Sequence, residues 1–158
     1  MCIRDRKEIQ HSAFKNQIQI ARELNLPLII HNRDSHQDML KVLKEENVKD
    51  IGGVMHSFTG DIDFLEKIIS MNMHVSFTGN ITFKKSTSDD LVKKAPVENL
   101  LLETDSPFMT PVPLRGKRNE PAFIVHTAKR IAELKEIDLE LLGRITTENA
   151  KNLFKIDI

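Results

Sequence analysis

The amino-acid sequence predicts an α/β protein with four parallel strands and flanking helices. Four short apolar segments, rich in leucine and β-branched residues, each end in polar or turn-forming residues; they are 26–31, 51–58, 73–80 and 100–107. Such runs suit strands that are buried on both faces, as in parallel sheets. Helical patterns lie between them, and the predicted strand ends, near residues 31, 56, 79 and 105, recur at the length of one βα unit. This pattern leaves two architectures open, a doubly wound open sheet or part of a (β/α)8 TIM barrel.

The helices of these units follow from apolar stripes and from residues that favour helix ends. A long apolar stripe precedes the first predicted strand. Shorter apolar stripes lie between consecutive strands, one of them directly after Gly60. The expected N-caps are Ser35, Ser88, Asp138 and Thr146, and Pro121 suits the first turn of a helix.

Length and composition bound the function. The chain has 158 residues with no internal linker, which indicates one domain, and a full TIM barrel typically needs about 250. A net charge of zero argues against a general nucleic-acid coat protein, and no apolar stretch is long enough to span a membrane. The single cysteine, Cys2, and a start without an apolar core favour a reducing cytoplasm over secretion.

Three chemically active residues stand at the predicted strand ends. They are His31, His56 and Asp105, on three different strands, while the sequence Thr-Gly-Asn occupies the fourth end at 78–80. Because the carboxyl ends of parallel strands meet on one side of a sheet, these side chains should converge. Two imidazoles and a carboxylate are ligands for a divalent metal ion, and an acid–base pair without metal is the alternative.

Other polar residues have structural or supporting roles. Glu103, two residues before Asp105, is expected either to point inward and hold a neighbouring residue by hydrogen bonds or to form an ordinary salt bridge. Solvated or packing roles are expected for the remaining histidines, which are His11, His36, His74 and His126. The segment 114–121 carries a basic cluster just before a helix start, which suits a phosphate or is simply solvated; Arg33 is a second phosphate candidate.

Five motifs together resemble the TatD-type metal-dependent hydrolases. They are HNRD (31–34), HSFTG (56–60), LETDSPF (102–108), RGKRNEP (115–121) and TENAKNLF (147–154). The family consists of TIM-barrel members of the amidohydrolase superfamily, typically metal-dependent deoxyribonucleases. The resemblance implies hydrolysis of DNA or another phosphodiester, with one or two divalent ions, Mg²⁺, Mn²⁺ or Zn²⁺.

By this resemblance, individual residues take roles in the site. His31, His56 and Asp105 match metal ligands, and Asp105 would also orient or deprotonate the attacking water. Arg33, Arg115 and Asn119 match positions near the site, where they would contact phosphate or order a loop.

The sequence also departs from the family pattern. It has no His-x-His motif and no metal-binding glutamate of a fourth strand, so 7–158 resembles only the C-terminal half of the barrel, strands five to eight. Residues 1–6 are interpreted as a leader outside the family domain, because only 3–6 match the family pattern, and only loosely. A half-barrel has two open sheet edges, so we expect marginal stability, an edge-paired dimer, or a need for the missing half. The alternative functions are hydrolysis of another bond, such as an amide or ester, and a catalytically inactive half-barrel.

Overall fold

The fold is a four-stranded parallel sheet in which chain order and spatial order coincide. The computed structural model describes residues 6–84 and 86–157, and within these the sheet runs in the order β1-β2-β3-β4. The strands are β1 (Leu28–His31), β2 (Gly53–His56), β3 (Met73–Phe77) and β4 (Leu100–Leu102). Sequential order with parallel pairing is the arrangement of a barrel wall, so the predicted four parallel strands are confirmed.

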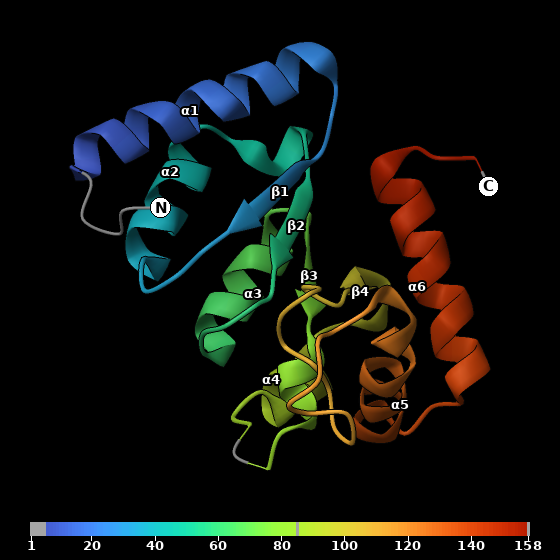
Figure 1. Cartoon of the computed structure of the whole chain (residues 1–158). Helices are drawn as coiled ribbons and strands as arrows, with labels where there is room; N and C mark the ends of the chain where they lie inside the picture. Colours follow the sequence, from blue (N-terminus) through green and yellow to red (C-terminus); the bar gives the residue numbers. More distant parts are fainter. Residues whose placement is uncertain (1–5, 85, 158) are drawn as a thin grey trace.

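Helices connect and flank the strands (Figure 1). The α-helices are α1 (Lys7–Leu24), α2 (His36–Glu45), α3 (Ile62–Ser70), α4 (Asp89–Lys94), α5 (Ile124–Lys135) and α6 (Leu139–Phe154). Short 3₁₀ turns complete the connections; they are η1 (Val48–Asp50), η2 (Gly79–Thr82), η3 (Val97–Asn99) and η4 (Pro121–Phe123). Helices α1 and α2 lie at the β1 end of the sheet, and α5 and α6 at the β4 end.

Local capping explains several helix starts. The Asp61 carboxylate accepts the Phe64 backbone N–H at 2.8 Å and so caps α3. Asp138 caps α6 in the same way, as predicted, by accepting the N–H groups of Glu140 and Leu141. The N-cap predicted at Thr146 is wrong: Thr146 lies inside α6, where its hydroxyl donates to the Leu142 carbonyl at 2.9 Å and therefore starts no new helix.

The hydrophobic core lies between the sheet and the helices that cover one of its faces. Its fully buried members come from both layers and include Ile18, Leu43, Leu65, Ile68, Val75, Leu100, Ile131 and Leu142. Burying each such side chain contributes roughly 1.5–3 kcal/mol. The outer strand β1 alternates, with Leu28 and Ile30 buried and Ile29 and His31 exposed. Ile29 is 67% exposed, so the face opposite the helices is open at β1.

Two further predictions concern the leader and membrane-spanning segments. The leader predicted over residues 1–6, including Cys2, lies outside the described residues except for Arg6, and it stays a prediction. In the part of the chain that the structure describes, no helix combines the length and apolarity that crossing a membrane requires.

Candidate metal centre and active site

His31 and His56 occupy the last positions of neighbouring strands. They are direct partners in the parallel register of β1 and β2, so their side chains emerge side by side at the carboxyl end of the sheet. Their ring centroids are 5.7 Å apart and the ring planes are inclined by 41°. The predicted convergence of these two histidines is therefore present, and it follows from strand register alone.

Glu103 fixes the orientation of the His56 ring. One Glu103 oxygen accepts the Nδ1–H of His56, and the other accepts the Ser57 backbone N–H at 2.5 Å. A carboxylate has no proton to donate, so Nδ1 carries the hydrogen, and in the neutral ring Nε2 is the nitrogen with the lone pair. Of the two roles expected for Glu103, the structure gives it the one of holding a neighbour, an arrangement that commonly supports metal-binding histidines.

Asp105 faces the other nitrogen of the same ring. Its Oδ1 lies 3.5 Å from His56 Nε2, and its side chain is about one third exposed. Strand β4 ends at Leu102, earlier than predicted, so Asp105 lies on the following loop with a left-handed backbone (φ 54°). The turn of the loop, rather than the predicted strand end, brings its carboxylate to His56.

The donor chemistry of this group fits a divalent cation. It offers the Nε2 atom of His56, a second imidazole from His31 and the Asp105 carboxylate. Over residues 6–84 and 86–157, however, no three His, Cys, Asp or Glu side chains are already arranged to hold a metal ion. The fold thus brings the predicted ligands together at the carboxyl ends of the strands. Their assignment as metal ligands stays a prediction.

Asn119 ties together the loop that carries Asp105, hereafter the 104–119 loop. Its side-chain amide donates to the carbonyls of Thr104 (2.7 Å) and Phe108 (2.6 Å), and its oxygen accepts the Glu120 N–H. The residue is 2% exposed. Both amide protons are used, so the contacts support the loop-ordering role expected for Asn119 and leave none for a phosphate.

The two predicted phosphate-binding arginines are both exposed, and both lie near the carboxyl ends of strands. Arg33 follows the end of β1 by two residues and lies 3.9 Å from the Asp34 carboxylate. The Arg115 guanidinium lies over the Phe83 ring, 3.9 Å from its centroid, and Phe83 follows η2 at the end of β3. Stacking restrains this cation without consuming its N–H groups. Nothing in the sequence pattern indicated Phe83 as the partner.

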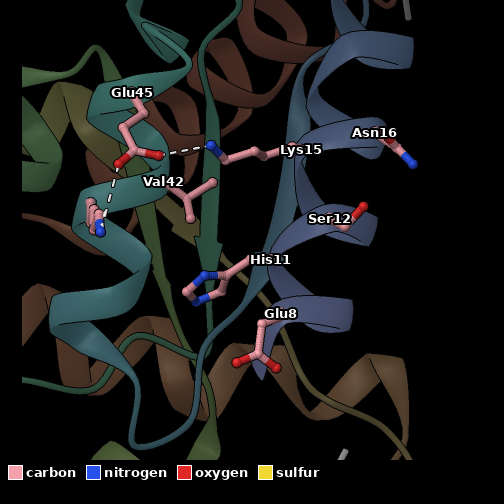
Figure 2. Close-up of a pocket in the computed structure, with 8 residues that line it drawn as sticks. Glu8, His11, Ser12, Lys15, Asn16, Val42 and Glu45 are labelled. Carbon is pink, nitrogen blue, oxygen red and sulfur yellow. Dashed lines mark hydrogen bonds and ion pairs between the residues drawn. The ribbon is translucent and has the colours of Figure 1, made fainter. Parts of the chain in front are cut away.

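A shallow pocket of about 490 Å³ lies elsewhere, between α1 and α2, and none of the predicted site residues lines it. Figure 2 shows its side chains, with Lys15 on α1 reaching Glu45 on α2 at 2.7 Å. The hydrogen bond with Glu45 raises the pKa of Lys15, and the same bond lowers the pKa of Glu45. This pocket is therefore lined by an exposed ion-pair network between two helices and not by the strand-end residues.

Comparisons with known proteins show which family the chain resembles. The family model described as TatD related DNase matches residues 3–155. The chain belongs to the TatD family. An uncharacterized metal-dependent hydrolase of Bacillus subtilis, YabD, is 50% identical over 152 residues, covering 96% of this chain and 60% of that protein. The 3'-5' ssDNA/RNA exonuclease TatD of Yersinia pseudotuberculosis is 35% identical over 153 residues, covering 93% of this chain and 59% of that protein.

A solved TatD-family structure shares the fold. The Escherichia coli TatD homologue YjjV superposes with a TM-score of 0.88 at 27% identity, covering 95% of this chain and 58% of that one. The chain accordingly has a TatD-like α/β fold of the TIM-barrel type. It spans about 60% of the length of the YabD and TatD relatives.

Proposed function

We propose that this chain is a metal-dependent phosphodiester hydrolase, a TatD-like nuclease. The observation that carries the proposal is His56, whose ring lies between Glu103 on one nitrogen and Asp105 on the other. An oriented imidazole with a free nitrogen beside a partly exposed carboxylate suits metal binding and water activation. The name of the Yersinia relative as an ssDNA/RNA exonuclease supports a nucleic acid as the substrate.

Each residue has a defined part in the proposed reaction. His31, His56 and Asp105 would hold the divalent ion, Mg²⁺, Mn²⁺ or Zn²⁺. The bound ion would lower the pKa of water and polarise a phosphoryl oxygen. Glu103 keeps the lone pair of His56 Nε2 directed at the site, and an Asp105 oxygen accepts the proton of the attacking water. Arg33 and Arg115 bind the flanking phosphates, because a guanidinium offers paired N–H donors to phosphate oxygens.

Hydrolysis assays with the purified chain test this function. We expect metal-dependent cleavage of single-stranded DNA that falls at least about 100-fold in His56→Ala, which removes a ligand, and in Asp105→Asn, which removes the carboxylate charge and the proton acceptor. His126→Ala on α5 is the control for loss of a histidine away from these ligands. Amide and ester substrates belong in the same panel. Cleavage of those alone, or undiminished DNA cleavage in both variants, contradicts the proposal.

We further propose that the four strands are the C-terminal half of a closed barrel. The exposed Ile29 and the outer positions of β1 and β4 support this, because barrel closure pairs such edges and covers such a face. The edges would pair in a dimer or with a complementary N-terminal half. Size-exclusion chromatography with light scattering should show self-association that Ile29→Lys weakens. A monomer with one sharp melting transition contradicts the edge-pairing proposal. Separately, a folded chain that neither binds metal nor cleaves substrate favours an inactive half-barrel.

A further inference from the structure

Phe108 is exposed in a way that sets it apart from the other phenylalanines. The chain has 8 Phe and neither Trp nor Tyr. Phe58, Phe64 and Phe77 are buried in the core and four others are half-buried. Phe108 is 68% exposed, the highest value among the large apolar side chains of the described residues. A single exposed apolar residue is unremarkable by itself, so its backbone setting and its neighbours decide its meaning.

The backbone of Phe108 is fixed on both sides. Its N–H donates to the Asp105 carbonyl at 2.8 Å, and its carbonyl accepts the Asn119 amide at 2.6 Å. The Asn119 backbone N–H also donates to the Pro107 carbonyl at 3.1 Å. The exposed ring therefore projects from a tethered loop. Presenting it to a ligand requires little further loss of backbone freedom, which favours binding.

Phe108 is also close to the proposed reaction centre. It lies three positions after Asp105 in the chain, a span of at most about 10 Å even when extended, and the hydrogen bond from its N–H to the Asp105 carbonyl shortens this span. A nucleotide whose phosphodiester lies against Asp105 places its base within reach of a side chain at this distance. The guanidinium of Arg115, on the same loop, supplies a cation for the phosphate backbone.

We propose that Phe108 is a base-stacking residue that selects unpaired nucleotides. This inference rests on the proposed nuclease function and adds the substrate feature that the chain recognises. A phenyl ring has no hydrogen-bonding group, so it stacks on any base without reading the sequence. Stacking requires a free base face, and the bases inside a duplex have both faces covered. The ring therefore favours single strands or frayed ends.

Equilibrium binding tests the inference without depending on catalysis. The probes are a fluorescein-labelled hexadeoxynucleotide and a labelled oligomer of six abasic tetrahydrofuran units, which has the same phosphates and no bases. Anisotropy is measured with the full chain in Ca²⁺. Phe108→Ala should weaken binding of the base-containing probe about tenfold, the order expected for one lost base stack, and leave the abasic probe within twofold. Phe108→Trp should retain binding and Phe108→Leu should not, because only the former keeps an aromatic face.

Val112→Ala is the matched control, since Val112 is an exposed apolar residue of the same loop, 43% exposed. It should bind both probes like the unaltered chain. The inference is overturned if the two probes bind equally, if neither binds, or if Phe108→Ala changes only the oligomeric state, which would make the ring a protein contact. Absence of hydrolysis with base-dependent binding intact would overturn the proposed nuclease function alone.

Discussion

The Nε2 atom of His56 lies 3.5 Å from the Oδ1 atom of Asp105. Glu103 binds the opposite nitrogen of the same ring, so the two acidic residues that follow β4 approach the imidazole from both sides. Because Glu103 also accepts the Ser57 N–H, it fixes the backbone just past β2 as well as the ring. The geometry of the candidate metal ligand therefore depends on a residue that would not itself touch the metal.

Replacing Glu103 tests this dependence. Glu103→Gln keeps the size of the side chain, but its amide group cannot accept both the His56 and the Ser57 N–H. We expect the affinity for Zn²⁺ or Mn²⁺ to fall about 10- to 100-fold, as is usual when the carboxylate behind a metal-binding histidine is lost. Isothermal titration calorimetry measures the change. Glu66→Gln is the control, because Glu66 makes an exposed ion pair with Lys94 at 3.0 Å; equal affinities of the two variants would contradict the role of Glu103.

Removal of the Asn119 amide should loosen the 104–119 loop. Asn119→Ala leaves the partly buried carbonyls of Thr104 and Phe108 without their donors, so we expect the free energy of unfolding to fall by about 1 to 3 kcal/mol. Urea denaturation measures this loss, and metal affinity should fall with it because Asp105 lies on the loop.

Asn149 offers a matched control for this variant. Its amide likewise donates to two carbonyls, those of Val97 at 2.8 Å and Leu100 at 2.9 Å. These carbonyls lie before and at the start of β4, whereas the 104–119 loop follows β4. Asn149→Ala should destabilise the chain by a similar amount and leave metal affinity unchanged. If both variants reduce metal affinity equally, the effect belongs to global stability and not to the loop.

The sequence predicted the strands from their apolar runs, and it predicted the proximity of His31 and His56 from their positions at the strand ends. A parallel sheet places the last residues of neighbouring strands together, so His31 and His56 needed only correct strand ends. The prediction that Asp105 lies near His56 rested on an incomplete reason, because a left-handed turn after β4, and not the strand itself, positions its carboxylate. Contacts formed across loops, such as those of Asn119 with Thr104 and Phe108, have no periodic signal and required the structure.

Gly79 should tolerate no side chain. A Cβ added there would meet the Met109 carbonyl oxygen and approach Pro111 N at 2.8 Å, so the 104–119 loop packs directly on the backbone of η2. Gly79→Ala should therefore destabilise the chain by about 1 to 3 kcal/mol through overpacking. Gly143 in α6 is the contrasting position, because a Cβ there meets nothing within 4 Å. Gly143→Ala should stabilise the chain by about 1 kcal/mol, since alanine favours helix. Thermal unfolding of both variants measures these changes: the melting temperature should fall in Gly79→Ala and rise in Gly143→Ala.

His74 should make stability depend on pH near neutrality. It is the second residue of β3, and its Nδ1 is buried without a hydrogen-bond partner among the described residues. Burial lowers the pKa of His74 below its ordinary value, and a hydrogen bond with the Gly53 backbone opposes this only in part. The folded chain therefore keeps His74 neutral at pH values where the unfolded chain already protonates it.

The sign of the effect follows from proton counting. Below about pH 6.5 the unfolded state binds more protons than the folded state, so the free energy of unfolding falls as the pH falls, until the lowered folded pKa is reached. Above this range both states hold His74 neutral and its contribution is constant. Urea titrations of the chain and of His74→Leu between pH 7.5 and pH 5 should diverge below about pH 6.5, with the variant losing less stability. Parallel curves would show that other groups set the pH dependence, and His126→Leu on α5 controls for removing a histidine elsewhere.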